Sequence, residues 1–139
     1  MSASSFRGSF GLLLLRLMVG WVFLSEGIQK FLYRAELGAG RFHRIGIPFP
    51  QFTAPVVGVV EIVCGALLIV GLASAFAIAA LLIDIAVAIA ITKVPIFMKH
   101  GFWIAMHESR TDFCMLVGLI AIALLGLGGF ALEGQRRGR

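Results

Sequence analysis

Five charged side chains interrupt stretches of sequence that are otherwise apolar: Arg16, Glu26, Lys30, Glu61 and Asp84. A charge inside an apolar span costs roughly 2.5–3.5 kcal/mol on insertion scales, so such residues usually face other charges or a water-filled cavity. Carboxyl groups beside a cation in these surroundings are typical of sites that handle protons or bind a polar headgroup. The depths of these charges along their helices indicate which of them can meet.

Glu26, Lys30 and Glu61 are expected to lie at one level. Lys30 follows Glu26 by four residues and therefore shares its helix face. At about 1.5 Å per residue, Glu26 lies roughly 7 Å before the end of its apolar segment and Glu61 roughly 9 Å after the start of the next one, so both lie near the same face of the membrane. We predict a polar cluster of these three residues, suited to a proton or a quinone headgroup, with a purely structural clasp as the open alternative. Four further polar residues fall near this level: Lys93, His107, Glu108 and Asp112.

Arg16 and Asp84 form a second candidate site, which we interpret as a structural ion pair. Counted from the opposite end, Arg16 lies roughly 9 Å and Asp84 roughly 15 Å deep, a difference that an arginine side chain can span. Small residues recur near the charges at a spacing of three or four, which predicts that these faces pack against neighbouring helices. These residues are Gly20, Gly27, Gly58, Gly65, Ala77, Ala80 and Ala88.

Four apolar segments must position these charges, and they cover residues 10–31, 55–72, 74–93 and 111–132. Each is close to the roughly 20 residues that a helix needs to cross a bilayer, and helices satisfy every backbone group there. We predict an all-α membrane protein, a compact four-transmembrane-helix bundle forming a single integral membrane domain over residues 1–139. Arg16 interrupts the first apolar stretch and no small-residue cleavage site follows, so we expect a permanent helix rather than a cleavable signal.

The connections between these segments differ in length. Only "LASA" joins the second and third segments, which predicts an antiparallel hairpin. The longer connections, residues 32–54 and 94–110, mix aromatic and basic residues as membrane interfaces do. Pro95 is expected to end the third helix, and "IFMKHGFWIAMH" to form a short interfacial helix between the third and fourth spans. The Lys and Arg distribution leaves the orientation open.

The overall composition supports a membrane location. The chain is 60% hydrophobic and 14% charged, against about 45–50% and 25% in soluble domains. We attribute the net charge of +5 to anchoring at lipid headgroups, so the predicted partner is the lipid bilayer and no nucleic acid is expected. The two cysteines form no C-x-x-C redox pair. The histidines lie in the connections without H-x-x-x-H spacing, so we expect no metal and no cofactor held by the chain itself.

Several stretches together resemble the DoxX family of small four-helix membrane proteins. They are "GLLLLRLMVGWVFLSEGIQKF", "IGIPFP", "VVGVVEIVCGALLIVGL" and "KHGFWIAMHESRTDFCMLVGLIAIALLGLGG". In this resemblance Arg16, Lys30 and Glu61 match the family's charged positions, whereas Asp84 does not belong to the pattern. The family's frequent Thr-Arg pair before the third helix is replaced by "ASAF".

The resemblance implies a multi-pass protein of the bacterial inner membrane. Some members are the small subunit of a thiosulfate:quinone oxidoreductase, and others accompany a superoxide dismutase and a sulfurtransferase. A subunit of a redox complex with quinone as the candidate cofactor is therefore expected. The alternatives are a non-catalytic accessory subunit that packs against a larger membrane enzyme, and a small solute or proton carrier. The resemblance assigns no catalytic residue, and the expected protein partner is a larger membrane complex or further copies of the chain.

Overall fold

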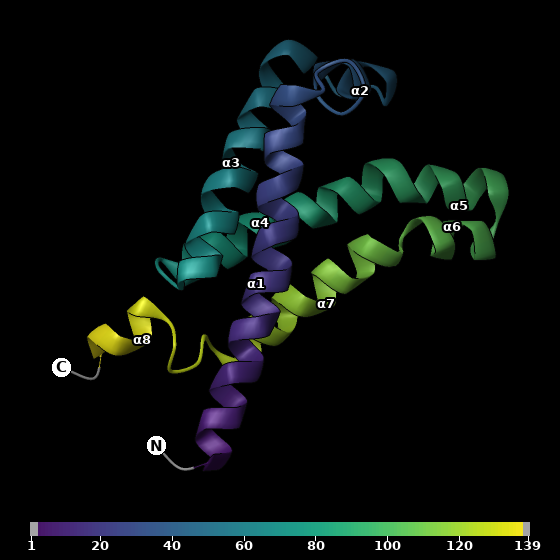
Figure 1. Ribbon diagram of the computed structural model, residues 1–139. Helices are drawn as coiled ribbons and strands as arrows, with labels where there is room; N and C mark the ends of the chain where they lie inside the picture. The colour runs from purple at the N-terminus through teal and green to yellow at the C-terminus, as the bar shows by residue number, and fades with distance from the viewer. Residues whose placement is uncertain (1–2, 138–139) are drawn as a thin grey trace.

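The computed structural model describes residues 3–137 as a set of helices joined by short turns (Figure 1). The long α1 (Ala3–Leu32) lies beside α3 (Pro50–Val70), and the short α2 (Ala39–Arg44) sits in the connection between them. A second hairpin projects from this pair. It consists of α4 (Ser74–Ala88), the π-helical turn η1 (Ile89–Lys93), α5 (Val94–His100), α6 (Phe102–Glu108) and α7 (Arg110–Leu125), and α8 (Leu132–Arg137) follows it.

Three helices in the described part are long and apolar enough to cross a membrane: α1, α3 and the continuous helix over residues 74–100. The prediction of an all-helical membrane protein is thus confirmed, but the count of four spans is not. The helix expected over residues 111–132 ends at Leu125 after 16 residues. Gly126 and Gly128 follow it with φ of 83° and 76°, a left-handed backbone that breaks the helix.

Pro95 does not end the third helix, contrary to the sequence prediction. The amide of Val94 donates to the carbonyl of Ile89, five residues earlier. This wider π-turn gives room for a proline ring, which would clash with a carbonyl in a regular α-helix. The chain reverses only at Gly101, where φ is 84°. The predicted interfacial helix is therefore divided, because its first half continues the long helix as α5 and only its second half forms the separate α6.

Glycines bring α1 and α3 into close contact. A Cβ atom on Gly27 would lie 2.6 Å from the Gly58 carbonyl oxygen, and one on Gly65 would lie 2.8 Å from the Gly20 carbonyl oxygen. The prediction that small residues face the neighbouring helix is confirmed for these two crossings. A buried apolar core also joins α1, α3, α4 and α7. Large apolar side chains point outward, where lipid would cover them: Leu14, Trp21, Phe76, Ile83, Phe113 and Leu124.

Arg16 does not pair with Asp84, and this sequence prediction is wrong. The Arg16 side chain is 1% exposed. Its Nε donates to the Leu68 carbonyl at 3.0 Å and its Nη2 to the Ile69 carbonyl at 2.6 Å. Its Nη1 donates to the Leu127 carbonyl at 3.0 Å. The last carbonyls of a helix lack intrahelical donors and carry partial negative charge. The partner of Arg16 is therefore the end of α3 and not Asp84.

Gly71 follows α3 and supports this arrangement. Its φ is 70°, and a Cβ there would lie 2.5 Å from the Ala131 Cβ and 2.7 Å from Arg16 Nη2. We expect Gly71→Ala to destabilise the protein by about 1–3 kcal/mol more than Gly46→Ala, because it adds overpacking to the backbone strain. Gly46 is a matched control, since its φ is 79° and its Cβ would meet nothing within 4 Å. Thermal unfolding in detergent measures both, and equal losses would contradict the expectation.

Candidate functional site

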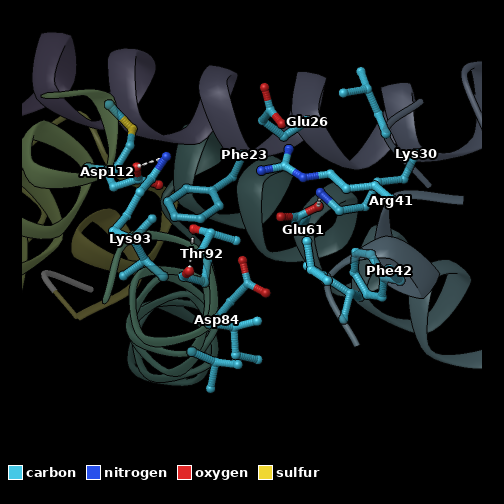
Figure 2. Close-up of a pocket in the computed structure, with 18 of the residues that line it drawn as sticks. Phe23, Glu26, Lys30, Arg41, Phe42, Glu61, Asp84, Thr92, Lys93 and Asp112 are labelled. Carbon is cyan, nitrogen blue, oxygen red and sulfur yellow. Dashed lines mark hydrogen bonds and ion pairs between the residues drawn. The ribbon is translucent and has the colours of Figure 1, made fainter. Parts of the chain in front are cut away.

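A cavity of about 390 Å³ lies between the α1–α3 pair and the second hairpin, and it is drawn in Figure 2. Its volume is within the range of about 300–1,000 Å³ that is common for small-molecule pockets. Of the chain's seven acidic residues, five line this cavity, namely Glu26, Glu61, Asp84, Glu108 and Asp112. Three cationic residues line it as well, namely Lys30, Arg41 and Lys93.

Lys30 and Glu61 form the central ion pair of the cavity. The Lys30 Nζ lies 2.6 Å from the Glu61 Oε2, and the two side chains are only 12% and 7% exposed. The glycine contact places them together, because a Cβ on Gly27 would lie 3.0 Å from the Glu61 Cβ. Glu26 lies one helical turn before Lys30 and lines the same cavity. The structure thus brings the three residues of the predicted cluster to one cavity.

Asp84 enters the cavity from α4, and its carboxyl faces that of Glu61 (Figure 2). Within residues 3–135, no cationic side chain lies within 4.0 Å of the Asp84 carboxyl. This carboxyl pair was not predicted from the sequence, because the depths of Glu61 and Asp84 were counted from opposite faces of the membrane.

A second ion pair lies between η1 and α7. The Lys93 Nζ is 3.2 Å from the Asp112 Oδ2, and these side chains are 16% and 20% exposed. They are therefore more accessible than Lys30 and Glu61. Glu108 also lines the cavity, whereas His107 does not. Of the four residues placed near this level from the sequence, the structure brings Lys93, Glu108 and Asp112 to the site.

The π-turn forms part of the cavity wall. Thr92 and Lys93, both in η1, line the cavity, and the Thr92 Oγ1 donates to the Ala88 carbonyl at 2.6 Å. Single π-turns inside helices are frequent at functional sites. The signal for this turn was Pro95 within an apolar run that otherwise continues as a helix, and we interpreted it as a helix end.

Arg41 is a site residue that the sequence analysis did not identify. It extends from α2 into the cavity (Figure 2). The neighbouring Phe42 is buried at 7% exposure and fixes α2 against the rest of the protein. The basic and aromatic composition of this connection matched a membrane interface equally well. Nothing in that pattern distinguished a cation inside the cavity from one at the lipid headgroups.

Comparisons with known proteins identify the family of this chain. The DoxX family model matches residues 11–94, a range that includes every charged residue of the cavity except Glu108 and Asp112. An uncharacterized membrane protein of Mycobacterium tuberculosis, Rv3486, is 48% identical over 133 residues, covering 91% of this chain and 82% of that protein. No solved structure matches the chain. The chain belongs to the DoxX family of membrane proteins.

Proposed function

We propose that this chain is a bacterial inner-membrane subunit of a quinone-linked redox complex, and that its cavity receives the quinone headgroup. The observation that carries the proposal is the set of cations and carboxyls gathered in one cavity of an apolar helical protein. Reduction of a quinone takes up two electrons and two protons. In this proposal the electrons come from a partner subunit, and this chain contributes the binding site and the groups that handle protons.

The lining of the cavity suits such a headgroup. Lys30, Arg41 and Lys93 bring charged donors that can hydrogen-bond to quinone carbonyl oxygens. Apolar side chains, among them Phe23 and Met115, supply the surface on which a ring can pack. A quinone tail would extend from the cavity into the lipid that surrounds the helices.

We include a fourth span in this proposal, formed by α7. Its buried residues Met115, Leu119 and Ile122 belong to the core, while Phe113 and Leu124 face outward. Sixteen residues extend about 24 Å, and a bilayer can thin locally around a short span. Tags at the two chain ends should then be accessible from the same side of the membrane. Access from opposite sides would exclude a fourth span.

A non-catalytic accessory role is the second candidate, and the α5–α6 hairpin favours it. Apolar side chains at its tip are at least half exposed, including Met98, Trp103 and Ile104. Such a surface could contact a larger membrane enzyme as well as lipid. Two measurements separate the candidates. An accessory subunit would co-purify with its partner at fixed stoichiometry, and the chemistry of that partner would stay unchanged in a strain that lacks this chain.

Quinone binding to the purified protein in lipid nanodiscs tests the first proposal. We expect saturable binding of a short-tailed ubiquinone analogue, and we expect Glu61→Gln to remain folded but to bind at least about tenfold more weakly. The reason is that, without the Lys30–Glu61 pair, the lysine that donates to the headgroup is no longer held in position. The charge-assisted hydrogen bond that would then be weakened is worth about 1.5–3 kcal/mol.

The matched control is Glu36→Gln, because Glu36 is exposed and does not line the cavity. This variant should bind the analogue like the wild-type protein. Absence of saturable binding to the wild-type protein, or equal affinities of the wild-type and Glu61→Gln proteins, would refute the quinone site.

A further inference from the structure

The charges that line the cavity do not balance. The facing groups are Glu26 and Lys30 from α1, Arg41 from α2, Glu61 from α3, Asp84 from α4, Lys93 from η1, Glu108 from α6 and Asp112 from α7. With all of them ionised, five negative charges face three positive ones, which leaves an excess of two negative charges. Glu108 is exposed and can be compensated from outside the protein, but the other seven groups are partly or fully buried and still carry one excess negative charge, which calls for a compensating cation or proton.

The two ion pairs determine where the excess lies. Lys30 is bound to Glu61 and Lys93 to Asp112. Asp84 is left in the cavity facing Glu61, without a cationic side chain within 4.0 Å among residues 3–135. Two carboxyl groups placed against each other cannot both remain ionised at little cost, whereas one proton shared between them converts repulsion into a hydrogen bond.

We propose that Glu61 and Asp84 form a proton-binding site, in which one proton is shared between the two carboxyls and exchanges with the outside through the cavity. Lys30 holds Glu61 in place from the other side, so Asp84 is the member of the pair that remains free to exchange. The site goes beyond the quinone proposal and does not require a quinone, because any proton-coupled process of the partner complex could use it.

Dicyclohexylcarbodiimide tests the site, because this apolar reagent enters membranes and modifies carboxyl groups that carry a proton. The acid oxygen bonds to the central carbodiimide carbon, and the proton passes to a nitrogen. The O-acylisourea formed then rearranges to a stable N-acylurea, and nothing is released. We expect mass spectrometry of the quinone-free protein in nanodiscs to locate the label on Glu61 or Asp84. The labelling should fall as the pH is raised.

Asp84→Asn separates a shared proton from simple burial. With Asp84 neutral, Glu61 has only Lys30 as its ionic partner and stays ionised, so its labelling should be lost. Asp112→Asn is the matched control, since it removes a cavity acid but leaves the Glu61–Asp84 pair intact, and labelling of the pair should persist. Size-exclusion chromatography of both variants checks that each remains folded.

Two results would overturn the proposal. One is a wild-type protein in which neither Glu61 nor Asp84 is labelled at any pH at which it stays folded, and this experiment needs no variant. The other is labelling of Glu61 that is present in the wild-type protein and equally strong in the Asp84→Asn protein. Quinone binding is absent from both measurements, so the proton site and the quinone site can fail independently.

Discussion

Replacing Arg16 with leucine is expected to lower the free energy of unfolding by about 3 kcal/mol or more. The change leaves three carbonyls without their donor, those of Leu68, Ile69 and Leu127. An unsatisfied buried polar group costs about 1–3 kcal/mol, and no water is present in the membrane interior to replace the guanidinium. Arg16→Lys should lose less stability, because an ammonium group can still reach some of these oxygens but cannot reproduce the planar fork.

Thermal unfolding of the detergent-solubilised variants measures this effect. Arg7→Leu is the control, because Arg7 lies on the same helix and is exposed. It should change the unfolding temperature little. If Arg16→Leu unfolded at the temperature of the wild-type protein, the interpretation of Arg16 as a structural link would be wrong.

Gly27→Leu is expected to separate α1 from α3 and to destabilise the protein by about 3 kcal/mol or more. A Cβ at this position already meets a backbone oxygen at 2.6 Å, that of Gly58, and the Ile62 Cγ1 at 2.8 Å. Overpacking usually costs about 1–3 kcal/mol, and here the backbone of a whole helix must move. The same displacement would pull Lys30 away from Glu61, so the cavity should be lost together with the stability.

Gly11→Leu provides the comparison on the same helix, since its Cβ would meet nothing within 4 Å. This variant should be as stable as the wild-type protein. Both are compared by unfolding in detergent and by carbodiimide labelling, which should disappear in Gly27→Leu and persist in Gly11→Leu. A Gly27→Leu protein that keeps its stability and its labelling would contradict the α1–α3 contact.

Much of the fold follows from local sequence properties. Long apolar runs can form only helices in a membrane, and the small residues at helical spacing identified the α1–α3 contact. The cluster of Glu26, Lys30 and Glu61 was predictable because its members lie at one depth, measured from one face of the membrane on two adjacent helices. These inferences need only the rise of the helix and the high cost of an isolated charge.

The partners of Arg16 and Asp84 could not be predicted, because several groups compete for each charge and the sequence does not show which one binds it. In a hydrocarbon core of about 30 Å, Asp84 near the middle is about equally distant from Arg16 and from Glu61. Depth therefore could not decide between them. The guanidinium of Arg16 binds backbone carbonyls at the end of α3 instead of Asp84. Every residue has a backbone carbonyl, so the amino-acid types do not indicate this partner. Arg41 was missed for a related reason, since a basic residue in a connection fits the interface as well as a cavity.

The positions of the ion pairs and of the Arg16 hydrogen bonds determine how the two hairpins are held together. Lys30–Glu61 joins α1 to α3, and Lys93–Asp112 joins η1 to α7, so each pair ties together elements of the same hairpin. At the opposite end, Arg16 of α1 binds both the end of α3 and the segment after α7. Arg16 therefore links the two hairpins at that end, in addition to the apolar core that joins them, while the carboxyls of Glu61 and Asp84 face each other in the cavity. Loss of a proton from these two carboxyls would add repulsion between the hairpins at a point away from Arg16.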